Sequence, residues 1–166
     1  HQGIVWGTQT KQTKQDEKLV NRFDYDGDYG TVLNRFLMQA AVGYKLTVHG
    51  TGGQTRAFIN INDTVECLRL ASENPPDING KVTIYNQVTE THRVRDLAKL
   101  ISNKFGAEIS FLDNPRKEDA ENDLAVDNTS FLKLGLKPTF LQDGLIEEVF
   151  EITMKYKDSA DLSLIP

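Results

Sequence analysis

The sequence predicts an α/β fold, for two reasons. Short apolar runs rich in β-branched and aromatic residues, which are typical of strands, alternate along the chain with segments of helical character. The helical segments are recognised by apolar residues that recur at three-to-four-residue spacing. With 166 residues and no internal repeat, the chain has the length of one ordinary domain, and we expect a single region over 1–166.

The expected elements follow one another in a regular order. A strand at residues 3–6 comes first, and the polar residues 8–28 form a long loop. The later elements are a helix from Val32 stopped by Gly43, strands at 46–49 and 56–61, a helix at 64–73, a strand at 81–86, a helix from Val94 closed by Gly106, a strand at 108–112, and helices at 130–134 and 142–157. Asp63 is expected to cap the helix at 64–73.

The stretch 46–63 is the most informative part of the chain. Its glycine-rich run 50–53 lies between two expected strands and therefore predicts a hairpin turn. A dinucleotide-binding glycine loop would instead join a strand to the N-terminus of a helix. The strand after the turn places Arg56 on the same face as Phe58 and Asn60.

Two arginines are candidates for binding an anionic ligand. Arg56 follows the glycine turn, and Arg116 follows an Asn-Pro pair in a polar loop. A guanidinium forms paired hydrogen bonds with a phosphate or carboxylate, so both positions suit such a ligand. The alternative for each is a structural salt bridge. Arg22 is a weaker candidate, because Asp24 and Asp26 follow it closely and offer surface ion pairs.

Composition excludes several classes of function. The net charge of −5 without a basic run argues against nucleic acid as a partner. No apolar run approaches the roughly 20 residues of a membrane-spanning helix. Cys67 is the only cysteine, so no disulfide can form within the chain, and this suits a reducing compartment. One cysteine and three scattered histidines do not provide the ligands of a zinc site. No metal site is therefore expected.

Two further patterns resemble catalytic or metal-binding motifs but fail on their residues. The acidic run 24–28 begins like a calcium loop, yet its sixth position is Tyr29 and its twelfth is Arg35, where glycine and glutamate are required. We interpret this run as a turn in which Asp28 caps the next helix. No tyrosine is followed four residues later by lysine, and we expect no catalytic residues in this chain.

Seven short blocks carry a family resemblance. They are Gln2-Gly3-Ile4-Val5-Trp6-Gly7, Asn21-Arg22-Phe23-Asp24-Tyr25-Asp26, Leu33-Asn34-Arg35-Phe36, Gln39-Ala40-Ala41-Val42-Gly43, Gly52-Gly53-Gln54-Thr55-Arg56, Asn114-Pro115-Arg116 and Leu134-Gly135-Leu136. In these blocks the chain resembles the C-terminal half of the UDP-sulfoquinovose synthase family of extended short-chain dehydrogenases/reductases. The resemblance implies a substrate-binding portion with small sheets flanked by helices, and two strands, 3–6 and 81–86, from a Rossmann sheet.

The resemblance also implies an activity. Members of this family hold NAD tightly and make UDP-sulfoquinovose from UDP-glucose and sulfite, with the NAD motif and the catalytic Thr, Tyr and Lys in their N-terminal half. Since this sequence opens inside an apolar strand at His1, without methionine, we expect a fragment that lacks that half and is inactive alone. The expected partners are UDP-glucose, sulfite, the N-terminal half and a second copy in a homodimer or higher oligomer. The expected location is the cytoplasm or the plastid stroma.

The resemblance assigns roles to particular residues. Arg56 and Arg116 would bind the UDP diphosphate, and Glu118 would accept hydrogen bonds from the ribose hydroxyls. The uracil pocket would include Val48 and His49, although the family commonly has an aromatic residue at the His49 position. The residues expected to face the glucose or sulfite region are Gln2, Arg22 and Tyr25.

Two other functions stay open. A different NAD-dependent sugar-nucleotide epimerase or dehydratase would act without sulfite. A non-catalytic sugar-nucleotide-binding module would bind UDP-glucose and perform no chemistry. We also expect the strands 3–6 and 81–86 to present unpaired edges, so that the isolated chain associates with itself or is marginally stable.

Overall fold

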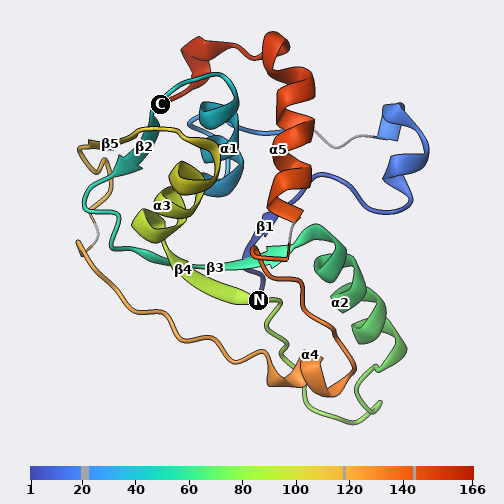
Figure 1. The fold of residues 1–166 in the computed structure, drawn as a ribbon. Helices are drawn as coiled ribbons and strands as arrows, with labels where there is room; N and C mark the ends of the chain where they lie inside the picture. Colours follow the sequence, from blue (N-terminus) through green and yellow to red (C-terminus); the bar gives the residue numbers. More distant parts are fainter. Residues whose placement is uncertain (20–22, 118, 144) are drawn as a thin grey trace.

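The computed structural model describes residues 1–19, 23–117, 119–143 and 145–166. It has the predicted α/β class, with helices packed around two small sheets (Figure 1). The strands are β1 (Ile4–Trp6), β2 (Leu46–His49), β3 (Thr55–Asn60), β4 (Glu90–Arg93) and β5 (Ile109–Leu112). The α-helices are α1 (Val32–Ala41), α2 (Ile61–Glu73), α3 (Val94–Phe105), α4 (Thr129–Lys133) and α5 (Leu145–Tyr156). The short 3-10 helices are Thr13–Gln15, Glu17–Leu19, Lys157–Ser159 and Leu162–Leu164.

Two sheets organise the described residues. In the first, β3 lies in the middle, parallel to β1 in the register Ile4↔Phe58 and antiparallel to β4 in the register Phe58↔Glu90. In the second, β2 runs parallel to β5 in the register Leu46↔Ile109. The two sheets therefore meet where β2 ends and β3 begins.

The hairpin predicted for residues 46–61 is wrong, because β2 and β3 belong to different sheets. Gly50 and Gly52 have positive φ values of 62° and 66° and lead the chain from one sheet into the other. The amide of Gly50 donates to the Leu112 carbonyl at 2.8 Å, which extends the pairing of β2 with β5. Residues 46–48 are all buried, whereas a hairpin strand with one solvated face would alternate, and burial of both faces is typical of parallel pairing.

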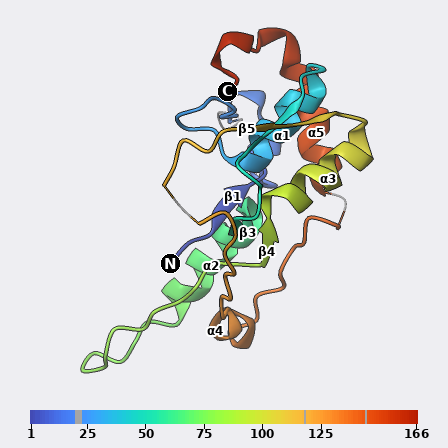
Figure 2. The same ribbon diagram turned by 90° about the vertical axis from the view of Figure 1, so that its left-hand side faces the viewer.

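The strand predicted at 81–86 is also wrong. Val82 is 87% exposed and Ile84 66% exposed, and the described part of the chain provides no ladder partner for this segment. Figure 2 shows the segment after α2 extending away from the rest of the molecule. Backbone contacts with the N-terminal residues begin only at the end of this segment. The N-terminal amine of His1 donates to the Tyr85 carbonyl at 2.7 Å, and Gln87 accepts from the Gly3 amide at 2.9 Å and donates to the His1 carbonyl at 2.8 Å. The strand β4, which follows, was not predicted.

Helix starts differ from the predictions by a few residues. The N-cap of α2 is Asn60, whose side chain accepts from the Asn62 amide at 2.9 Å, so the helix begins before Asp63. The carboxylate of Asp63 is buried and accepts from the amide and hydroxyl of Thr139 at 2.6 and 2.9 Å. Asp63 thus anchors a distant segment and does not cap α2. The last helix, α5, begins at Leu145 and not at residue 142.

The N-terminal loop also departs from its prediction. Two 3-10 helices lie within residues 8–28, which were expected to be irregular. The residue at the N-cap of α1 is Thr31, so Asp28 does not cap this helix. Its neighbour Asp26 instead accepts from the amides of Asp28 and Tyr29 at 2.9 and 2.6 Å, as expected of a turn.

The main core lies between the sheets and three helices. Helix α1 contacts both α3 and α5, and its apolar face is completely buried at Leu33, Phe36 and Leu37. Gly106, with φ of 74°, ends α3 as predicted. The side chains of β3 alternate as expected, since Phe58 packs in this main core and Ile59 in a smaller one beneath α2 and α4.

Candidate functional site

A cleft of about 490 Å³ opens where the two sheets meet. Its walls come from the start of α1, the end of β2, the start of β3 and the loop after β5. The lining includes Ile4, Asp28, Thr31, Arg35, His49, Gln54, Arg56, Val94, Asn114 and Arg116. Segments far apart in the sequence therefore bring three arginines and a histidine together.

The cleft unites three of the residues that the sequence singled out, namely Arg56, Arg116 and His49. Arg56 lies near the start of β3, where one Nη donates to the Thr55 carbonyl at 3.2 Å. Val48 precedes His49 on β2 and is fully buried, so it backs the cleft without lining it.

Gln2 and Tyr25 lie away from this cleft. Gln2 is exposed and pairs with Gln87 next to β1. The Tyr25 hydroxyl accepts from the Asp161 amide at 2.7 Å, and its ring borders a separate apolar pocket of about 330 Å³. Arg22 and Glu118 lie outside the described residues.

The loop that carries Arg116 is fixed on the side that precedes it. The Asn114 side chain accepts from the Arg116 amide at 3.0 Å, which closes a tight turn. A Cβ placed on Gly50 would lie 3.2 Å from the Cβ of Asn114, so the turn packs closely against the connection between β2 and β3.

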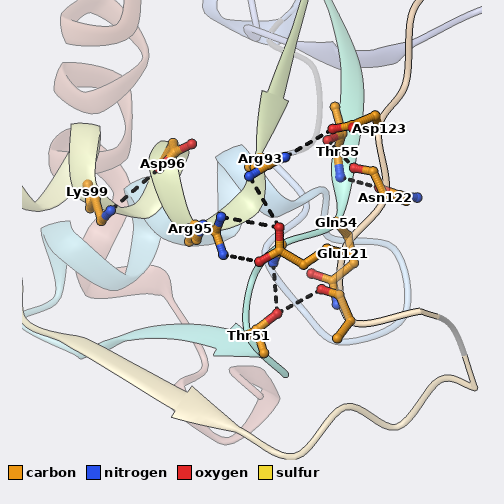
Figure 3. Close-up of polar contacts among 12 residues, drawn as sticks. Thr51, Gln54, Thr55, Arg93, Arg95, Asp96, Lys99, Glu121, Asn122 and Asp123 are labelled. Atoms are coloured by element: carbon orange, nitrogen blue, oxygen red, sulfur yellow. Dashed lines mark hydrogen bonds and ion pairs between the residues drawn. The ribbon is translucent and has the colours of Figure 1, made fainter.

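The same loop is also fixed on the side that follows Arg116. Figure 3 shows Glu121 between the guanidinium groups of Arg93 and Arg95, at 3.2 and 2.5 Å. Asn122 accepts from the Thr55 amide at 2.6 Å and from its hydroxyl at 2.7 Å. These contacts attach residues 121–122 to the first residues of β3 and α3, beside Arg56. They therefore fix the point at which the loop after Arg116 returns to the sheet.

Arg35 is the cleft residue that the sequence analysis missed as a ligand candidate. It lies on α1, and its Nη2 donates to the Thr47 carbonyl at 3.2 Å. One turn later, the fully buried Gln39 donates to the Thr47 hydroxyl at 2.6 Å and accepts from the Thr47 amide at 3.1 Å. Two polar residues four positions apart on an otherwise apolar helix face were the available signal.

The cleft is electropositive. Burial lowers the pKa of Arg35, and the like charge of Arg116 lowers it further. Burial also lowers the pKa of His49, and Arg35 and Arg116 add to this shift. The His49 imidazole is therefore neutral at pH 7, while the arginines supply the positive charge. This arrangement suits an anion with an adjoining flat, uncharged group.

Comparison with known proteins agrees with the family resemblance found in the sequence. No protein-family model matches the chain. The chain is 45% identical to UDP-sulfoquinovose synthase, chloroplastic, of Spinacia oleracea over 99% of its own length and 35% of that protein. It is 37% identical to UDP-sulfoquinovose synthase of Sulfolobus acidocaldarius over 82% of its own length and 36% of that protein.

The chain belongs to the UDP-sulfoquinovose synthase family. This confirms the resemblance carried by the sequence blocks. The chain spans about a third of the length of these two curated relatives.

The fold of this UDP-sulfoquinovose synthase family member is shared with solved epimerases. A crystal structure of UDP-glucuronic acid 4-epimerase from Bacillus cereus, in complex with UDP-glucuronic acid and NAD, matches with a TM-score of 0.63 and 20% identity. The match covers 95% of this chain and 44% of the epimerase. At this identity the likeness shows the fold alone, and it confirms the predicted fold of small sheets flanked by helices.

The described residues add two observations about this family member. They contain no group of three or more His, Cys, Asp or Glu side chains arranged to hold a metal ion. Nor does any helix among them have the length and apolar character needed to cross a membrane.

Proposed function

We propose that this chain provides the UDP-sugar-binding part of an enzyme that makes UDP-sulfoquinovose from UDP-glucose and sulfite. The observation that carries the proposal is the electropositive cleft, in which Arg56 and Arg116 come from different elements and face one ligand-sized space. The 45% identity to the spinach enzyme supports the substrate assignment.

The proposed roles follow from charge and shape. Arg56 and Arg116 bind the two phosphates through paired hydrogen bonds, which a guanidinium forms and an ammonium does not. His49, neutral at pH 7, lies against the uracil, and the buried Val48 supports this wall of the pocket from behind. Glu118 accepts from the ribose hydroxyls.

The proposal extends to residues outside the cleft. Gln2, Arg22 and Tyr25 are proposed to act in the glucose or sulfite region when the rest of the enzyme is present. A homodimer or higher oligomer, and a location in the cytoplasm or plastid stroma, stay predictions.

NAD is the cofactor implied by the family, and the described residues do not fit it. The run Gly50–Gly53 joins two strands, β2 and β3, so its amides do not precede a helix N-terminus as a dinucleotide-binding loop requires. We therefore propose that NAD is bound by a part of the enzyme outside residues 1–166, which also supplies the catalytic Thr, Tyr and Lys.

The proposal is tested by complementation. The chain is co-expressed with the N-terminal, NAD-binding part of the spinach relative, and UDP-sulfoquinovose formation is measured from UDP-glucose, NAD and sulfite. Product is expected only when both parts and sulfite are present. A folded, NAD-containing complex without turnover would contradict the enzymatic proposal.

The same assay separates the two other functions. Conversion of UDP-glucose when sulfite is omitted would indicate an epimerase or dehydratase of different outcome. Binding of UDP-glucose by the chain, with no turnover under either condition, would indicate a non-catalytic binding module. The double variant Arg56→Gln/Arg116→Gln is the matched control, since it removes both phosphate ligands and is expected to abolish binding and turnover together.

A further inference from the structure

We propose that Arg35 is a third cationic ligand of the diphosphate and makes the cleft selective for two adjacent phosphates over one. This inference rests on the proposed function, in which the cleft binds a UDP-sugar. It adds a residue from α1 to the two arginines that the sequence indicated.

The first observation is that Arg35 is held in place at the cleft. It lines the same space as Arg56 and Arg116 and donates from Nη2 to the Thr47 carbonyl at 3.2 Å. Thr47 is itself fixed by two hydrogen bonds to Gln39. A guanidinium held in this way loses little conformational entropy when it binds an anion.

The second observation is that Arg35 lacks a counter-charge. Among the described residues no carboxylate forms an ion pair with it, and Asp28, the acidic residue of the cleft lining, is joined to it by no ion pair. The charge that acts on Arg35 is that of Arg116, which is positive. Its Nε is buried and makes no hydrogen bond within the described part of the chain.

These two observations point to an anion. A half-buried cation that lacks a counter-charge is unfavourable, and a second cation nearby increases the cost. One anion placed among the three arginines would compensate both effects. Because Arg35, Arg56 and Arg116 come from α1, β3 and the loop after β5, a ligand with two adjacent phosphates can engage more of them at once than a single phosphate can.

The experiment measures affinities of the 166-residue chain for UDP-glucose and for UMP by calorimetry. Arg35→Met removes the charge and keeps the length of the side chain, and Arg35→Lys keeps the charge but loses the fork. Arg69→Met is the matched control, because Arg69 is an exposed arginine of α2 paired with Glu66 and Glu73. Arg35→Met is expected to weaken UDP-glucose binding by about 10- to 100-fold and UMP binding much less, so that the preference for UDP-glucose is lost.

The outcomes separate this inference from a merely structural role. If Arg35 served only to hold Thr47, Arg35→Met would lower the unfolding temperature and leave the preference for UDP-glucose over UMP unchanged, which would overturn the inference. Should Arg35→Met fail to fold, Arg35→Lys decides the question. If Arg35→Lys prefers UDP-glucose over UMP as strongly as the wild-type chain does, the inference is overturned. If its preference for UDP-glucose is reduced, the inference is supported. Failure of the wild-type chain to bind UDP-glucose would instead contradict the proposed function itself.

Discussion

The contact between Gln39 and Thr47 makes a prediction about stability. Gln39 is completely buried and forms two hydrogen bonds with Thr47, at 2.6 Å to the hydroxyl and at 3.1 Å from the amide. Replacement by methionine keeps the volume and removes both bonds. It also leaves the Thr47 amide without a partner in a dry environment.

The magnitude follows from these losses. A buried hydrogen bond contributes about 0.5–1.5 kcal/mol net, and an unsatisfied buried donor costs about 1–3 kcal/mol. Since the methionine gains some apolar burial in return, we expect Gln39→Met to lower the free energy of unfolding by about 2–3 kcal/mol. Because Thr47 precedes Val48 and His49 on β2, we also expect weaker UDP-glucose binding.

Urea unfolding followed by circular dichroism measures this change, and an unchanged m value would show that the unfolded state is the same. The control is Gln12→Met at an exposed position, which is expected to change stability by less than about 0.5 kcal/mol. Thr47→Val removes only the hydroxyl, so the double variant should lose less than the sum of the two single losses. A change for Gln39→Met no larger than that of the control, or strict additivity, would refute the reasoning.

Three further predictions concern other positions near the cleft and the core. Gly52→Ala should lower the free energy of unfolding in urea by about 1–3 kcal/mol more than Gly43→Ala does. Both glycines have positive φ, but only at Gly52 would a Cβ clash, at 2.7 Å from Val48, so equal losses would contradict this. Burial raises the pKa of Asp63 above its ordinary 3.8, so its contribution to stability is complete below that value and is lost as pH rises through the folded pKa. Asp63→Asn should therefore flatten the fall in urea midpoint as the pH rises above the ordinary pKa of 3.8, and parallel pH profiles for the two proteins would exclude this. Arg116→Gln should weaken UDP-glucose binding about tenfold and reduce its salt dependence in calorimetry, whereas an unchanged affinity would remove Arg116 from the site.

The helices could be predicted well because their signals are local. The apolar residues of α1 and α3 recur at helical spacing, and Gly106 ends α3 in the left-handed conformation that the sequence indicated. The pairing of strands could not be predicted in this way. β2 and β3 are neighbours in the sequence and look like a hairpin, but β2 pairs with β5, which lies beyond two further helices.

The same limit explains the error at 81–86. Its apolar residues have β-propensity, but a strand forms only where another strand supplies a ladder of hydrogen bonds. Among the described residues, only the N-terminal amine of His1 donates to the backbone of this segment, at the Tyr85 carbonyl. At the cleft, Arg56 and Arg116 stand out in polar or turn-flanking contexts. Arg35 did not, because an amphipathic helix is interpreted through its apolar face and its polar positions are assumed to meet water.

The placement of the cleft at the junction of the two sheets has a consequence for the dynamics of the protein. β3 carries Arg56, whereas β2 and the loop after β5 carry His49 and Arg116, so a bound diphosphate would cross-link two sheets that share no strand pairing. Ligand binding should then slow amide hydrogen exchange in both sheets together, including strands such as β4 that touch no ligand.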